Sequence, residues 1–557
     1  MPPRYAELLD NAKAPQTEAV DARQILNNAG GYAFAVDEWT RLDRFLILGS
    51  EAATYYQSAR KLTRENATSV RKCYELDGRR TVARIVEVST RGLAPRVSPA
   101  IFALALGTLA ANADTRQEAY RAMRKVLRTA SHLFEFIATT QVLGKGWGRG
   151  LKRAVAEWYE TRDPDKLAFQ VIKYRTRNDM THGRLLRTTH PKPAEDDHAR
   201  RSLYEWILRG TTDDPDHLPE IVHLHEDAMA APSATDLATI VAKARLPWEA
   251  IPTSALNFPE VWRAMLPTLG LTALIRNLGR LTRIGVIKPL GDETRFIAEQ
   301  LIDVERLKRE RVHPFQILLA LSVYKNGRPV AAARRGVSVE QGWQPVTEIA
   351  DALNDAFHKA FAAVIPTGKR HLIALDVSGS MNAQMMGSPL TAREASAAMA
   401  LITIATENRT QVTAFSNRLT PLDVGRISTI SGMLKKINGL TFSSTDCSLP
   451  MIHALNKNIP VDAFIVYTDN ETWAGKTHPH IALQQYRQKM GIPAKLIVVG
   501  MTSTGFSIAD PGDGGMLDVV GFDSSAPAVM ADFVREPVGR NEAAQTKMED
   551  GAASAVA

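Results

Sequence analysis

Apolar positions follow one periodicity in the first two thirds of this 557-residue chain and another in the last third. From about Trp39 onwards they recur every three or four residues, as on one face of a helix, in short segments joined by polar links. The segment that begins Ser98-Pro99 has a typical helix start, because serine caps a helix and proline tolerates its first position. Many segments of similar length predict stacked helix pairs, an α-solenoid, with a compact all-helical domain as the alternative.

After about residue 366, short apolar runs alternate with helical segments, which is typical of βαβ units and a mostly parallel sheet. The predicted strands are 372–376, 411–415, 463–468, 495–499 and 517–520, and the predicted helices are 392–407, 427–437, 480–490 and 528–535. The chain is therefore predicted to be multidomain, with an all-α repeat region followed by a doubly wound α/β domain.

Composition adds a charge asymmetry to this division. Residues 366–557 hold 16 Lys and Arg against 17 Asp and Glu, whereas the preceding residues hold 52 against 43. The net charge of +8 therefore originates in the helical region, which favours a polyanionic partner such as nucleic acid. Two cysteines, an N-terminus punctuated by charges and the lack of an apolar run of about 20 residues predict a soluble intracellular protein.

The first basic stretch of interest spans residues 145–158. Trp147, Leu151, Val155 and Trp158 fall on one helical face, and we interpret this stripe as core rather than as a base-stacking surface. The basic residues that point elsewhere, toward water or a ligand, are Arg149, Lys152 and Arg153.

A second basic stretch, residues 172–187, gathers cationic side chains around what the pattern predicts to be two helix ends. Thr181 is placed to cap the second helix. A single histidine is usually structural, but His182 stands among guanidinium groups of the kind that bind phosphate in pairs. The candidate phosphate contacts are Lys173, Arg175, Arg177, His182, Arg184 and Arg187.

Three loops at the predicted carboxyl edge of the sheet carry oxygen side chains. Ligands of parallel sheets bind at this edge, where the ends of neighbouring strands meet. Carboxylates and hydroxyls form an oxygen-only set that suits Mg²⁺, with water or a partner's carboxylate in the remaining positions. The candidate ligands are Asp376, Ser378, Ser380, Thr445 and Asp469, and ordinary polar strand-end loops are the alternative.

The same stretch does not fit two common catalytic arrangements. A phosphoryl-accepting aspartate would require a second carboxylate two residues after Asp376, where Ser378 stands. A Gly-x-Ser-x-Gly nucleophile elbow fails because Asp376 and Ser380 occupy the glycine positions. We therefore predict that the protein is not an enzyme.

The pattern Asp376-x-Ser378-x-Ser380, joined by Thr445 and Asp469, is similar to the metal-ion-dependent adhesion site of von Willebrand factor A domains. Together with further matches in one order, the chain from about residue 30 to about residue 535 resembles the Ro autoantigen (TROVE-domain) family, in its bacterial branch. The further matches include residues 49–51, 54–56, 147–149, 274–279, 313–315, 366–370, 445–451 and 468–472.

The resemblance implies a division of the chain into a flexible segment (1–29), a ring of HEAT-like helix pairs that binds RNA (30–361), a von Willebrand factor A domain (362–540) and a disordered tail (541–557). It also implies that His182 contacts a small Y-like noncoding RNA and that single-stranded 3′ ends of misfolded or precursor RNAs enter the ring. Our own candidates for the residues that line its hole are Arg149, Lys152 and Arg153. Expected partners are a 3′-to-5′ exoribonuclease and an acidic ligand at the metal site.

We therefore expect a cytoplasmic, monomeric RNA-binding protein of RNA quality control that carries a divalent cation, Mg²⁺ first, and does not bind a membrane. The alternative is a metal-dependent protein-interaction scaffold in which RNA binding is secondary.

Overall fold

The computed structural model divides the chain into two units. The helical unit consists of Val70–Ala360, and the α/β unit combines Met1–Ser69 with Phe361–Ala557. The structure describes residues 15–48, 69–94, 96–144, 146–177, 179–310, 312–328, 342–360, 365–383, 390–425, 428, 430–440, 444–502, 504–521 and 526–536. Among the helices of these residues, none combines the length and the apolar character needed to cross a bilayer.

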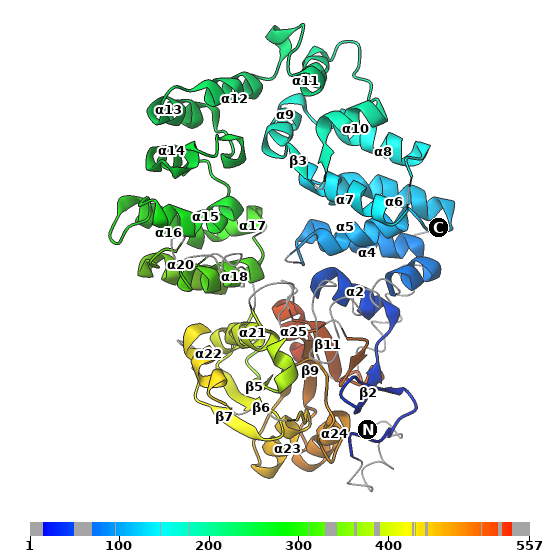
Figure 1. The fold of residues 1–557 in the computed structure, drawn as a ribbon. Helices are drawn as coiled ribbons and strands as arrows, with labels where there is room; N and C mark the ends of the chain where they lie inside the picture. Colours follow the sequence, from blue (N-terminus) through cyan, green and yellow to red (C-terminus); the bar gives the residue numbers. More distant parts are fainter. Residues whose placement is uncertain are drawn as a thin grey trace. The chain divides into compact units, whose positions relative to one another are not determined.

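The helical unit is a series of short helices that pack on their neighbours in the chain, as the repeating apolar stripes predict (Figure 1). Short helices cannot bury a whole apolar face alone, so each depends on the next for its core. The helices of this unit whose two ends are both described include α4 (Gly78–Arg91), α5 (Ser98–Gly107), α6 (Ala113–Val126), α7 (Ala130–Val142), α8 (Arg149–Glu160), α9 (Pro164–Lys173), α10 (His182–Thr189), α11 (His198–Arg209), α12 (Glu220–Ala230), α13 (Ala234–Ala244), α14 (Pro259–Met265), α15 (Leu271–Arg283), α16 (Asp292–Ile302), α17 (Val304–Arg309), α18 (Pro314–Lys325) and α20 (Thr347–Lys359).

Two features of this unit position the residues discussed below. A small antiparallel hairpin, β3 (Thr176–Arg177) and β4 (Met180–Thr181), separates α9 from α10. The two ends of the helical series meet, because the buried His313 ring places Nε2 3.1 Å from the Leu93 carbonyl oxygen, 220 residues earlier in the chain.

The α/β unit contains a six-stranded sheet in the order β11-β9-β8-β5-β6-β7, parallel except for the edge strand β7. Its strands are β5 (Arg370–Asp376), β6 (Arg409–Phe415), β7 (Leu419–Leu422), β8 (Ala463–Thr468), β9 (Lys495–Gly500) and β11 (Met516–Val520), and its helices are α2 (Glu38–Leu48), α21 (Ala392–Thr406), α22 (Ile430–Asn438), α23 (Leu449–Asn456), α24 (Pro479–Met490) and α25 (Ala526–Arg535). The predicted strands and helices of this region are all present, and sequence analysis missed β7 and α23.

Alternating strand residues build two apolar layers, one on each face of the sheet. Leu372 and Phe464 pack with α23 and α24, whereas Ile465 and Ile497 face α21 and α25. Both faces are therefore buried, which explains why the parallel strands are almost continuously apolar in sequence. The predicted fold class, a helical region followed by a doubly wound, mostly parallel α/β domain, is confirmed.

The sequence predicts a domain boundary at residue 30, whereas the compact units of the structure divide at Ser69. Residues 15–29 belong to the α/β unit, where β1 (Gln24–Leu26) pairs with β2 (Tyr32–Ala35) and β2 pairs with β10 (Phe506–Ser507). Residues 36–48 belong to the same unit, since the buried Arg44 guanidinium lies 2.5 Å from Asp518 Oδ2. Strands this short, completed by a partner 470 residues away, have no local sequence signal. The predicted disordered tail, 541–557, lies outside the described residues.

Candidate functional site

The carboxyl edge of the sheet brings together the oxygen side chains that the sequence predicts to meet. Strands β5 and β8 are parallel neighbours that end together, so Asp376 and Asp469 approach each other from adjacent loops. Asp376 Oδ1 accepts the Ser378 backbone N–H at 2.9 Å, and Oδ2 accepts the Thr468 hydroxyl at 2.7 Å. The first loop is therefore folded back around its own aspartate.

Hydroxyl groups connect the two aspartates. The Ser378 and Ser380 hydroxyl oxygens lie 3.1 Å apart, and the Ser380 side chain is hydrogen-bonded to Asp469. Thr445 is buried, and its carbonyl oxygen accepts the Trp473 backbone N–H at 3.0 Å, which ties the second loop to the third. Four of the predicted metal ligands, Asp376, Ser378, Ser380 and Asp469, thus lie in one hydrogen-bonded neighbourhood, and Thr445 is joined to the third loop through its backbone. We call these five residues and Glu471 the carboxylate cluster.

Burial strongly perturbs the acids of this cluster. Asp376, Asp469 and Glu471 are each 0% exposed. Burial, and then the charges of Asp376 and Glu471, raise the pKa of Asp469 well above its usual range, and burial raises the pKa of Glu471 to about 7. Arg393 of α21 lies behind the first loop and donates to the Val377 and Ser378 carbonyl oxygens at 2.8 and 3.0 Å.

These residues fit a hard divalent cation. Asp469 Oδ2 is buried and has no hydrogen-bond partner, so a strong acceptor faces the cluster unsatisfied. A divalent ion would offset the repulsion among three buried carboxylates and would take oxygen ligands of this kind. In the described part of the chain no three His, Cys, Asp or Glu side chains converge as a metal site, so such an ion would depend on the serine and threonine hydroxyls.

Sequence analysis missed the N-terminal residues that hold the third loop, residues 469–477. Gln16 Oε1 accepts the Thr472 hydroxyl at 2.5 Å, and Gln16 Nε2 donates to Asp446 Oδ1 at 2.8 Å. Asn28 Nδ2 donates to Glu471 Oε1 at 2.6 Å. A Cβ atom at Gly31 would lie 1.9 Å from the Thr472 carbonyl oxygen, so this close approach requires glycine. We call residues 16–31 the N-terminal clasp.

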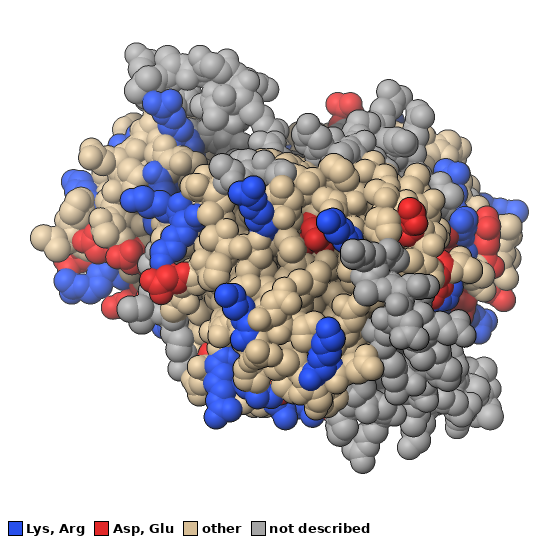
Figure 2. Space-filling view, turned by 90° about the horizontal axis from the view of Figure 1, so that it is seen from below, with Lys and Arg blue, Asp and Glu red and all other residues tan. Residues whose placement is uncertain are grey.

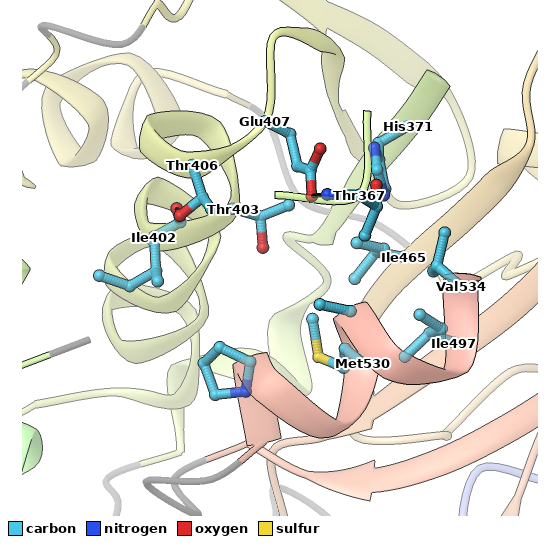
Figure 3. Close-up of a pocket in the computed structure, with 12 residues that line it drawn as sticks. Thr367, His371, Ile402, Thr403, Thr406, Glu407, Ile465, Ile497, Met530 and Val534 are labelled. Carbon is cyan, nitrogen blue, oxygen red and sulfur yellow. Dashed lines mark hydrogen bonds between the residues drawn. The ribbon is translucent and has the colours of Figure 1, made fainter. Parts of the chain in front are cut away.

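A small cavity beside the start of β5 is a weaker candidate for a binding site than the carboxylate cluster. It lies between α21 and α25, with His371 and Glu407 toward one side and Met530 and Val534 on the other (Figure 3). Its volume is about 20 Å³, room for about one water molecule. Glu407 uses both carboxylate oxygens on the backbone N–H groups of Thr367 and Gly368, so its polar groups hold the start of β5.

In the helical unit, the predicted RNA contact His182 is buried, not exposed. Its side chain is in the core beside Phe134, with the ring centroids 4.9 Å apart. Tyr159 Oη lies 2.9 Å from Nδ1, and the Tyr174 carbonyl oxygen lies 3.1 Å from Nε2. A carbonyl can only accept, so Nε2 carries the proton and Nδ1 accepts from tyrosine. Burial lowers the pKa of His182 to about 4, so the ring is neutral at pH 7.

That the His182 ring itself contacts RNA stays a prediction, and the structure does not present this ring at the surface. Both ring nitrogens are occupied within the protein, and a neutral buried ring offers no charge to a phosphate. Its bond to Tyr174 instead fixes the backbone of the cationic segment 173–176. His182 is thus a positioning residue for this segment.

The cationic neighbours of His182 stay near the surface. Arg175, Arg184 and Arg187 are exposed, and Lys173 is half-buried with Nζ 5.6 and 5.5 Å from the Phe169 and Tyr174 ring centroids. Thr181 Oγ1 accepts the Arg184 backbone N–H at 3.2 Å, which confirms the predicted helix cap. Arg177 lies in β3, and its side chain is outside the described atoms.

Helix α8 places its apolar stripe in the core, as predicted. Leu151, Val155 and Trp158 are buried, and Trp158 Nε1 donates to the Leu127 carbonyl at 2.7 Å. Trp147 is the exception, because it precedes the helix and is half-buried. Arg149 and Arg153 are exposed and Lys152 is half-buried, so all three are available to a ligand. That they line a hole stays a prediction.

A third group of basic residues, on α15, was not singled out by sequence. Arg276, Arg280 and Arg283 recur at helical spacing opposite the buried Leu274 and Leu278. Arg280 Nη1 is buried without a hydrogen-bond partner, and burial together with Arg283 lowers the pKa of Arg280. The amphipathic spacing was a signal for this basic face, but it is shared by many solvated helices.

Figure 2 shows one face of the molecule, on which lysine and arginine side chains are scattered over mostly uncharged surface together with fewer acidic side chains. On this face the basic side chains do not form one continuous patch.

Comparison with known proteins identifies the class to which these two units belong. Residues 25–215 and 240–330 match the TROVE domain, and residues 370–534 match the Ro60 vWA domain. The chain belongs to the Ro (TROVE-domain) family.

Two relatives and one solved structure are similar along nearly the whole chain. The RNA-binding protein RO60 of Deinococcus radiodurans is 42% identical over 94% of this chain and 98% of its own. RNA-binding protein RO60 of Caenorhabditis elegans is 34% identical over 93% of this chain and 91% of its own. The crystal structure of the Deinococcus radiodurans RO (RSR) protein covers 90% of this chain and 99% of that chain, with a TM-score of 0.66 and 42% identity.

Proposed function

We propose that this chain is a noncatalytic RNA-binding protein whose helical unit binds phosphates through the exposed basic residues around His182. The observation that carries the proposal is that Arg175, Arg184 and Arg187 are exposed and are held by one buried framework. Guanidinium groups bind phosphate oxygens in pairs, and several together give the affinity that RNA-binding proteins derive from the backbone. The relatives named as RNA-binding proteins support this choice of ligand.

The finer part of the proposal concerns which RNA is bound. We propose that a small Y-like noncoding RNA contacts the residues around His182, and that misfolded or precursor RNAs present single-stranded 3′ ends to the ring. This would place the protein in cytoplasmic RNA quality control, maturation or decay, beside a 3′-to-5′ exoribonuclease. Single strands expose base edges that a duplex covers, so preference for a 3′ tail is the expected property.

For the α/β unit, we propose that the carboxylate cluster holds Mg²⁺ through Asp376, Ser378, Ser380, Thr445 and Asp469. The unsatisfied Asp469 Oδ2 and the raised pKa values of the buried acids support this proposal. The ion would supply an open coordination position for an acidic ligand. The second candidate function, a metal-dependent protein-interaction scaffold, rests on this cluster.

The experiment that tests the function compares two RNAs of equal length with the full chain, freed of copurified nucleic acid. One is a duplex with a single-stranded 3′ tail and the other is blunt. We expect tighter binding of the tailed RNA in a gel-shift titration and a steep loss of affinity with salt. Equal, salt-insensitive binding of both RNAs would favour the scaffold. Sequencing RNA that copurifies from the protein's own cells would name its ligands.

A further inference from the structure

A pocket in the helical unit combines cationic and anionic side chains in a way that phosphate binding alone does not explain. Its volume is about 300 Å³, and it is formed by α7, the end of α9, β3 and the 3₁₀ turn Trp248–Ala250. This size is at the lower end for small-molecule sites, enough for one nucleotide but not for a base pair. The lining residues are Ser131, Lys173, Tyr174, Arg175, Thr176 and Glu249.

The cationic side of the pocket suits a phosphate. Lys173 and Arg175 both come from the segment that His182 fixes through the Tyr174 carbonyl. The Arg175 guanidinium is hydrogen-bonded to His225 Nε2 of α12. Burial, and then the charge of Arg175, lower the pKa of His225 to about 4, so at pH 7 this ring accepts the hydrogen bond without adding charge. Arg175 is therefore held in place before a ligand arrives.

The anionic side of the pocket requires a different ligand group. Glu249 Oε2 is buried and has no hydrogen-bond partner. An unsatisfied buried acceptor is costly, so a donor supplied by the ligand would stabilise it. A carboxylate repels phosphate, which means that Glu249 cannot be a further backbone contact. It would accept N–H groups of a base, as acidic side chains do when they read base edges.

Guanine matches this requirement best among the four bases. Its Watson–Crick edge offers two adjacent donors, the N1–H and the exocyclic amino group, to one carboxylate. Adenine and cytosine offer one amino group each, and uracil presents an N–H between two carbonyl oxygens that a carboxylate repels. Because pairing would hide this edge, only an unpaired guanosine can use it.

We infer that this pocket binds one unpaired guanosine nucleotide of an RNA strand, with Glu249 accepting from the base and Lys173 and Arg175 contacting the phosphate. The inference rests on the proposed RNA-binding function and deepens it by assigning a base preference. Glu249 is then a specificity residue rather than a source of overall affinity.

The test measures a ratio of affinities with the full-length chain. Two fluorescent oligouridine strands are compared by polarisation, one of them carrying a single central guanosine. The expected ratio is about tenfold in favour of the guanosine strand, as one good base contact provides. In Glu249→Gln the ratio falls close to one, because an amide cannot accept both N–H groups. The control Glu305→Gln, at a side chain 81% exposed on α17, keeps the ratio.

Base analogues test the same contact without any mutation. Inosine lacks the exocyclic amino group, so its strand should bind between the guanosine and uridine strands, and 1-methylguanosine should lose the preference. A ratio of one in the unaltered protein, an unchanged ratio in Glu249→Gln, or inosine equal to guanosine would overturn the inference while RNA binding stands. Failure of every strand to bind would instead overturn the proposed function.

Discussion

The carboxylate cluster and the basic residues around His182 differ in what burial does to their charged groups. In the α/β unit the acids themselves are buried, so Asp376, Asp469 and Glu471 have raised pKa values and repel one another. In the helical unit the neutral His182 is buried, and the charged Arg184 and Arg187 stay in water. Buried carboxylates that lie close together favour binding of a small cation. Exposed arginines on a rigid support favour binding of an extended polyanion such as RNA.

The largest expected effect is at Asp469, whose buried charge should bind the metal ion but also repels the neighbouring carboxylates. In Asp469→Asn, Mn²⁺ binding should weaken about 100-fold or more, because a ligand oxygen and a charge are lost. The metal-free protein should gain thermal stability, since repulsion from Asp376 and Glu471 disappears. Titration with Mn²⁺ by electron paramagnetic resonance, and thermal unfolding in a chelator, measure the two effects. Asp532→Asn, at a side chain 72% exposed, is the matched control; unchanged Mn²⁺ affinity at Asp469→Asn would remove the metal proposal.

The next effect concerns the neutral histidine. Because the pKa of His182 is about 4 in the folded protein against an ordinary 6.5, protonation favours the unfolded chain. The free energy of unfolding therefore keeps its full value above pH 6.5 and falls as the pH drops toward 4. At pH 5 it is lower by about 2 kcal/mol. His182→Gln should lower stability at pH 8 but flatten this dependence between pH 7 and 5. Chemical unfolding of both proteins at several pH values is the measurement, and parallel curves would show that His182 is not held neutral.

A smaller effect should follow from loosening the N-terminal clasp. Gln16→Ala removes the side-chain bond to Thr472 in the third loop and the side-chain bond to Asp446 in the second. Mn²⁺ affinity should fall about tenfold, as for other residues that orient metal ligands, without loss of RNA binding. Glu18→Ala, at a neighbouring exposed side chain, is the control. Equal Mn²⁺ affinity in Gln16→Ala and the unaltered protein would mean that the clasp only stabilises the fold.

Local patterns predicted the parts of each site that lie close together in sequence. The run that ends in Asp376-x-Ser378-x-Ser380 predicted both a strand and its oxygen loop, because parallel strands bring their carboxyl ends to one edge. Thr181 predicted a cap for the same kind of local reason. Asp469 lies beside the first loop because β5 and β8 are parallel neighbours that end at the same edge.

Contacts between distant segments could not be predicted in this way. Gln16 bonds to Thr472 across 456 residues, and no local pattern marks a glutamine for that role. The burial of His182 depends on Phe134 and Tyr159 from two other helices, so the cationic surroundings in sequence suggested an exposed ring. Sequence proximity to charged residues therefore predicted an exposed ring, whereas the structure buries it.

The most direct test of the central claim measures RNA affinity after neutralising the exposed arginines around His182 while leaving the histidine in place. Arg175, Arg184 and Arg187 are replaced together by glutamine, and the control replaces Arg121, Arg295 and Lys308, whose side chains are 69%, 73% and 60% exposed on other helices. Both variants lose three positive charges. We predict that the first variant binds tailed RNA about tenfold more weakly. The slope of its log affinity against log salt concentration should be smaller by about two, because fewer counterions are released, and the RNA affinity of the second variant should change little. Equal loss in both variants would contradict the claim that this surface, rather than overall charge, binds RNA.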